Sequence, residues 1–123
     1  MKNQIVIYQT KSGALELRAD VARDTFWLTQ QQVADIFDVQ KAAISKHVKN
    51  IFDSGELEQK ATVSKMETVQ AEGGRHVKRN IEYYNLDLVL SIGYRVNSKQ
   101  ATHFRQWATK TLKSHILKGY TIN

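Results

Sequence analysis

The chain has 123 residues, a formal net charge of +6, 41% hydrophobic residues, and neither cysteine nor proline. This length and composition are typical of one folded domain spanning residues 1–123, and the lack of cysteine excludes a disulfide framework, a thiol nucleophile and a cysteine zinc site. The longest apolar run, residues 5–8, is too short for a membrane span or a signal peptide, so we expect a cytoplasmic protein.

The positive charge is concentrated at the end of the chain. Residues 1–87 carry 12 basic and 12 acidic side chains and sum to zero, whereas residues 88–123 carry six basic side chains and no acidic one. Such an asymmetry predicts a polyanionic partner, either nucleic acid or an acidic membrane surface. The other interpretation is a solvated basic helix that binds nothing.

The first 28 residues predict β structure. Residues 5–10 and 14–18 suit two strands joined by a turn at 11–13, because leucines alternate with polar residues in the second strand. Residues 26–28 form either a third short strand or the apolar start of the next helix. We therefore expect an N-terminal β-hairpin within residues 1–28.

Two short helices are predicted over residues 29–52. Thr29 and Gln32 have the spacing of a capping box, in which each side chain bonds the backbone of the other residue. A second apolar stripe begins after Lys41. Asp38 lies at the turn between the helices, where left-handed backbone is needed and Asp tolerates it better than most residues. This pattern resembles repressor-type helix-turn-helix motifs.

The face of the second helix opposite its apolar stripe is polar and basic, with three lysines and no acid between Gln40 and Asn50. Residues near the N-terminus of a recognition helix reach base edges in the major groove, so we predict that this face contacts DNA. The predicted DNA-contacting residues here are Gln40, Lys41, Ala42, Ser45, Lys46, Lys49 and Asn50. The alternative is the ordinary solvent face of a surface helix.

A β-hairpin is predicted after these helices, within residues 60–84. Strands at 61–69 and 75–84 flank a turn at 71–74, where two glycines supply positive φ angles. In this position a hairpin is the wing of a winged-helix domain, whose basic tip meets phosphates. The predicted DNA-contacting residues of the wing are Arg75, His76, Lys78 and Arg79. A structural hairpin with a solvated tip is the alternative.

Residues 86–119 predict two more helices. A short one covers residues 87–93, and a long one is capped by Asn97 or Ser98 and ends at Gly119. The long helix is also the candidate interface of a homodimer, since a single domain of this size reads only a few base pairs.

The basic residues of this C-terminal region are candidates for phosphate contacts. They are Arg95, Lys99, Lys110 and Lys113. Two interpretations stay open for Arg95. With Asn97 and Ser98 it forms an anion site at a helix N-terminus, or it pairs with Asp87 in a structural turn.

Several segments resemble the RhuM virulence-associated family of bacteria. They are WLTQ (27–30), ISKHVKNIF (44–52), GEL (55–57), YYNLD (83–87), SIGYRVNS (91–98), FRQWAT (104–109) and KGY (118–120). The resemblance covers nearly the whole chain in family order. It implies a DNA-binding protein without an established reaction. Family members are often longer, sometimes with a Fic-type domain at the C-terminus, so this chain would match their N-terminal core.

No catalytic constellation is predicted from these residues. The four histidines include no pair at the i, i+4 spacing of helical metal ligands. We therefore expect no enzyme activity, metal, cofactor or small-molecule substrate.

The predicted fold class is α+β, a winged helix-turn-helix with an N-terminal β-hairpin and a long C-terminal helix. We expect a homodimer that binds double-stranded DNA and no membrane, as a transcriptional regulator or a DNA-targeting module of a mobile or virulence-associated locus. The alternative is a protein-interaction adaptor that keeps the winged helix as a scaffold.

Overall fold

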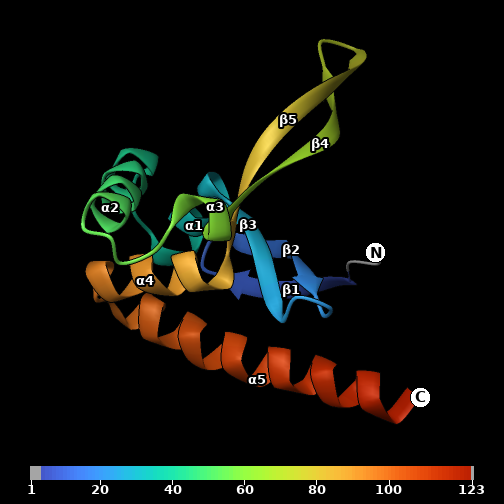
Figure 1. The fold of residues 1–123 in the computed structure, drawn as a ribbon. Helices are drawn as coiled ribbons and strands as arrows, with labels where there is room; N and C mark the ends of the chain where they lie inside the picture. The colour runs from blue at the N-terminus through green and yellow to red at the C-terminus, as the bar shows by residue number, and fades with distance from the viewer. Residues whose placement is uncertain (1–3, 123) are drawn as a thin grey trace.

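The computed structural model describes the backbone of residues 4–122 and the side chains of residues 4–113. These residues form an α+β fold with a five-stranded antiparallel sheet and five helices (Figure 1). The elements are β1 (Gln4–Thr10), β2 (Gly13–Asp20), β3 (Thr25–Thr29), α1 (Gln30–Phe37), α2 (Lys41–Asp53), α3 (Gln59–Thr62), β4 (Val63–Glu72), β5 (Arg75–Asn85), α4 (Leu86–Val96) and α5 (Lys99–Ile122). The strand order in the sheet is β1-β2-β3-β5-β4.

The hydrophobic core lies between one face of the sheet and the helices. Leu17 of β2 and Phe26 of β3 are fully buried there. The ring of Tyr8 on β1 meets the rings of Phe104 and Trp107 on α5, at centroid distances of 5.2 and 4.7 Å. Helix α2 packs in turn on α1 and α4. The core therefore fixes α2 at the surface with one side turned inward.

The predicted N-terminal hairpin is confirmed, and the open question about residues 26–28 is resolved. These residues belong to a third strand, β3, which pairs with β2 through Arg18 and Trp27 and with β5 through Leu28 and Tyr84. Strand β3 thus joins the N-terminal hairpin to the rest of the sheet.

The connection from α1 to α2 follows the predicted local rules. The Thr29 hydroxyl accepts a hydrogen bond from the Gln32 amide at 3.1 Å, and the Gln32 side chain accepts one from the Thr29 amide at 3.0 Å. Asp38 has left-handed backbone, with φ 56° and ψ 50°. The turn occupies the three residues between Phe37 and Lys41. Capping box and left-handed turn are both confirmed.

The hairpin of β4 and β5 projects away from the other elements (Figure 1), and we call it the projecting hairpin. Its turn is the pair Gly73 and Gly74, with φ angles of 57° and 77°. The prediction that its first strand begins at residue 61 is wrong, because the short helix α3 extends through Thr62. The Thr62 hydroxyl donates to the Glu58 carbonyl at 2.8 Å, which closes that turn of helix.

The C-terminal helices differ in their bounds from the prediction. Helix α4 is longer than residues 87–93, because the Asn85 side chain caps its start at the Leu88 amide and Asn97 ends it in left-handed backbone. Ser98 then caps α5, its hydroxyl accepting from the Ala101 amide at 3.2 Å. The predicted stop at Gly119 is wrong, since α5 runs to Ile122. A glycine inside a helix costs only about 1 kcal/mol, which does not by itself end one.

Candidate nucleic-acid interface

Helix α2 presents one polar face to solvent. Ile44 and Ile51 are fully buried against α1 and α4, so the opposite side of the helix faces outward. The predicted residues that the structure finds exposed are Gln40, Lys41, Ala42, Ser45, Lys46, Lys49 and Asn50. The structure therefore gathers the whole predicted set on one accessible surface, which we call the α2 face.

The lysines of the α2 face are not equivalent. Lys49 pairs with Asp53 one turn later at 2.6 Å, and this hydrogen bond together with the Asp53 charge raises the pKa of Lys49. For Lys41 and Lys46, the described residues place no carboxylate within ion-pair distance. Lys41 and Lys46 thus carry the uncompensated charge of this face.

A side chain from α1 reaches across to the α2 face. The Gln30 amide nitrogen donates to the Lys41 carbonyl at 3.2 Å and also to the Ser45 hydroxyl. Gln30 was not among the predicted site residues. In the sequence it follows the Thr29 cap and ends the segment WLTQ (27–30), but the contact itself depends on how α1 crosses α2.

The basic residues of the projecting hairpin are all exposed, but two of them are paired with acids. Arg79 makes two hydrogen bonds to Glu72, at 3.1 and 2.8 Å, and this contact lowers the pKa of the Glu72 carboxyl. Lys78 lies 3.9 Å from Glu67. The remaining basic residues at the tip, Arg75 and His76, are exposed as well.

A cleft of about 490 Å³ joins the α2 face to the projecting hairpin. Its lining residues are Thr29, Gln30, Gln31, Lys41, Gln70, Asn80, Ile81, Glu82 and Tyr84. Polar amides and one lysine dominate this lining, and Glu82 is its only carboxylate. The start of α1, the start of α2 and the hairpin therefore share one continuous polar surface.

Arg95 pairs with a different acid from the one predicted, while its predicted anion site with Asn97 and Ser98 stays a prediction. Its guanidinium donates to Glu56 at 3.2 Å, so the predicted pairing with Asp87 is wrong. Ser91 also donates to the same Glu56 carboxylate. Arg95 instead ties α4 to the loop after α2. Burial, together with the charges of Arg95 and Lys46, lowers the pKa of His47.

The basic residues of α5 lie elsewhere. Lys99, Lys110 and Lys113 are exposed, but Figure 1 shows α5 on the opposite side of the molecule from α2 and the projecting hairpin, with α4 between α2 and α5. The predicted phosphate contacts thus separate into two surfaces.

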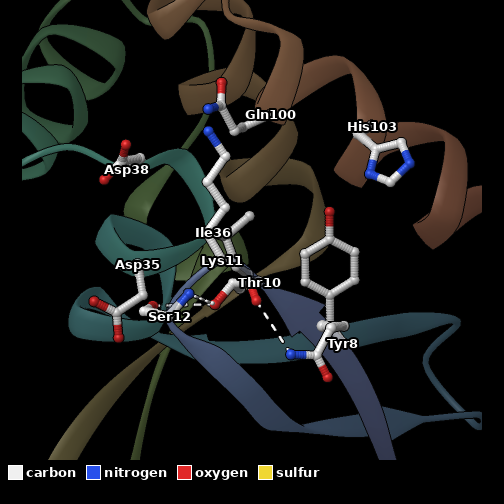
Figure 2. Close-up of a pocket in the computed structure, with 10 residues that line it drawn as sticks. Tyr8, Thr10, Lys11, Ser12, Asp35, Ile36, Asp38, Gln100 and His103 are labelled. Atoms are coloured by element: carbon white, nitrogen blue, oxygen red, sulfur yellow. Dashed lines mark hydrogen bonds between the residues drawn. The ribbon is translucent and has the colours of Figure 1, made fainter.

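A second cleft, of about 420 Å³, opens between β1, the end of α1 and α5. Figure 2 shows the Tyr8 side chain rising from β1 toward the side formed by Gln100 and His103. Burial raises the pKa of Tyr8. The cleft also carries Lys11 and Asp35, so its polar groups have both signs of charge and select no one class of charged ligand.

The described residues offer neither a cluster of metal ligands nor a membrane-spanning helix. Within the described residues, no group of three or more His, Asp or Glu side chains is placed to hold a metal ion. No helix in this part of the chain is long and apolar enough to cross a membrane.

Comparison with family models matches residues 61–123 to the Virulence protein RhuM family. The matched residues include the projecting hairpin, α4 and α5, while α1 and α2 precede them. No curated protein and no solved structure matches the chain.

Proposed function

The chain belongs to the RhuM family of virulence proteins, and from its structure we propose that it binds double-stranded DNA as a winged helix-turn-helix. In this proposal α1 and α2 are the helix-turn-helix and the projecting hairpin is the wing. The observation that carries it is the α2 face, where the whole predicted set of polar and basic residues is exposed beside a cleft shared with the hairpin. The protein would act as a transcriptional regulator or a DNA-targeting module.

The α2 face fits the needs of major-groove recognition. The groove is about 12 Å wide and admits one helix. Lys41, Ser45 and Lys46 would approach base edges there, with Gln40 and Ala42 beside them, because they occupy the first half of the helix. Lys49 and Asn50 would then meet the phosphate backbone.

The hairpin supplies the second contact. Arg75, Lys78 and Arg79 would grip the flanking phosphates, which adds affinity and orientation without sequence discrimination. Two copies would bind a two-fold site, since one helix reads only a few base pairs. The proposed role is binding alone, with no catalytic step, cofactor or small-molecule substrate.

The first test is fluorescence anisotropy of a mixed-sequence duplex across a salt series. We expect affinity to fall steeply with salt, with a slope that corresponds to roughly 4–8 neutralised phosphates. If no duplex binds even at low salt, the DNA proposal fails and the adaptor function takes its place.

Charge reversal then locates the contact surface. Lys46→Glu with Lys49→Glu is expected to lower affinity by more than about tenfold and to reduce the salt slope by roughly 2, because each phosphate contact contributes about 0.9. The matched control is Lys110→Glu with Lys113→Glu, which changes net charge by the same amount on α5. Loss of binding in the control alone would move the interface from α2 to α5.

A further inference from the structure

Gln30 and Ser45 form a contact whose hydrogen-bond polarity is fixed by the backbone. The side-chain amide of Gln30 has one end that donates and one end that only accepts. The end near α2 lies 3.2 Å from the Lys41 carbonyl, which accepts hydrogen bonds and cannot donate them. The amide nitrogen must therefore be the atom that faces both Lys41 and Ser45.

The consequence for Ser45 is that its hydroxyl accepts from Gln30. A helical serine often donates back to the carbonyl four residues earlier, here Lys41. The hydrogen bonds of the described residues do not include that contact. The Lys41 carbonyl instead accepts a hydrogen bond from the Gln30 side chain. The Ser45 hydroxyl therefore has no protein acceptor among the hydrogen bonds of the described residues, and Ser45 is exposed on the α2 face, where its proton is available to a ligand.

We propose that Gln30 is a positioning residue that occupies one lone pair of Ser45 and so aims the Ser45 hydroxyl proton at an acceptor on a base edge in the major groove. This inference rests on the proposed DNA-binding function. A free serine hydroxyl either donates to or accepts from a base, and so discriminates poorly. With one of its two lone pairs occupied by Gln30, Ser45 donates more readily than it accepts, which favours the purine N7, the guanine O6 or the thymine O4.

The base that this arrangement disfavours is cytosine. In the major groove cytosine offers only the N4 amino donor, which needs the one remaining lone pair of Ser45 and leaves the aimed proton without an acceptor. Reversing the hydrogen-bond polarity between Gln30 and Ser45 should therefore change which base is preferred. In Gln30→Glu, the carboxylate loses the hydrogen bond to the Lys41 carbonyl but can accept the Ser45 proton, so the Ser45 oxygen would then accept from the DNA and cytosine would be tolerated.

The experiment begins with selection of preferred sites from a pool of randomised duplexes by the native chain. Affinity is then measured for each base substitution in the selected site, for the native chain and for Gln30→Ala, Ser45→Ala and the double variant. We expect Gln30→Ala and Ser45→Ala to relax the preference at the same base pair by about 5- to 100-fold. The double variant should be no worse than Ser45→Ala alone, because Gln30 acts through Ser45.

Gln31→Ala is the matched control. Gln31 is the next residue of α1, lines the same cleft and is exposed, but its amide bonds Asp35 at 2.9 Å instead of α2. The base preference of Gln31→Ala should equal that of the native chain. Gln30→Glu is the second test variant, because it reverses the polarity of the hydrogen bond to Ser45. For each variant, an unchanged salt slope on a random duplex shows that the protein still folds and binds DNA.

The outcomes separate this inference from the function on which it rests. If the pool yields no bound duplex, the DNA-binding proposal fails. If a site is selected and Gln30→Ala keeps every base preference, or relaxes a different base pair from Ser45→Ala, the positioning role of Gln30 is wrong while DNA binding stands.

Discussion

At the scale of single residues, two buried tyrosines have shifted titration. Tyr8 and Tyr84 are both 6% exposed, and burial raises the pKa of each phenol above its ordinary value. For Tyr84 the nearby charge of Glu82 acts in the same direction. The folded state therefore holds these protons to a higher pH than the unfolded chain does, where tyrosine titrates at about 10.

This difference predicts the alkaline limit of stability. The contribution of the two phenols is fully present below pH of about 10 and is lost as pH rises toward their folded-state pKa, because the unfolded chain then binds fewer protons. Urea unfolding at a series of pH values from 8 to about 11.5 measures the free energy of unfolding.

Tyr8→Phe with Tyr84→Phe should flatten the alkaline decline, and the exposed Tyr94→Phe should leave it as in the native chain. Lysine titration contributes equally to all three, so the difference between variants isolates the buried phenols. An equal decline in every variant would show that the two phenols titrate alike in the folded and unfolded states.

Single residues also show that local caps and turns can be predicted from sequence, whereas contacts between elements cannot. Thr29, Gln32 and Asp38 act over a few residues of chain, so their spacing alone predicted the cap and the turn that the structure contains. The contacts of Gln30 with Ser45 and of Arg95 with Glu56 join different elements. They depend on how helices cross in space, and a helical wheel of either element alone does not contain that information.

At the scale of elements, the projecting hairpin is a separable part of the fold. Its strands pair with each other from Val63 and Tyr84 at the base to Glu72 and Arg75 at the tip. Core residues lie only at the base, since Tyr84 is buried while Val69 is 62% exposed. The outer hairpin therefore contributes little to the core and is free to serve binding.

Shortening the hairpin tests whether its outer part serves DNA binding and not stability. Residues 67–80 are replaced by Asn-Gly between Met66 and Ile81, which pair directly and suit a two-residue turn. We expect the midpoint of thermal unfolding to change by less than about 5 °C. The salt slope of DNA binding should fall by roughly 2–3, as the phosphate contacts of Arg75, Lys78 and Arg79 are lost.

A second variant of the hairpin is expected to raise DNA affinity. Glu67→Gln with Glu72→Gln removes the acidic partners of Lys78 and Arg79 and frees both cations for phosphate. Affinity should then rise. If shortening leaves affinity unchanged and the glutamine variant does not raise it, the hairpin has no part in DNA binding.

Elements with strong periodicity were predictable and short ones were not. The strands of the N-terminal hairpin and the two helices after it carry clear apolar repeats, and their predicted positions hold to within a few residues. Helix α3 has four residues, too few for an apolar stripe. It is closed by contacts such as that from the Asn85 side chain to the Ala61 carbonyl at 3.2 Å, which comes from β5.

At the scale of the whole molecule, the sheet has two edges of different character. Strand β4, at one edge, carries Lys65, Glu67 and Glu72, and charged side chains protect an edge from pairing. Strand β1, at the other edge, has no charged residue, and Ile5 and Ile7 are more than half exposed on it. The unprotected edge is therefore β1.

For the expected homodimer, this edge is a second candidate interface beside α5. Among residues 99–113, the apolar stripe of α5 is turned into the core, and no large apolar side chain there is strongly exposed. Two β1 strands running antiparallel around a two-fold axis present the same uncharged edge to each other, as a symmetric interface requires. We propose that the sheets of two copies join through β1.

Analytical ultracentrifugation of Ile5→Lys with Ile7→Lys tests this interface, because lysines on an edge strand oppose strand pairing. We expect the native chain to sediment as a dimer and this variant as a folded monomer, since both side chains face solvent in one copy. Val69→Lys, equally exposed on the projecting hairpin, should remain a dimer. The dimer is contradicted if the native chain is monomeric at high concentration, both free and on DNA. If a dimer survives both isoleucine substitutions, its interface lies away from β1.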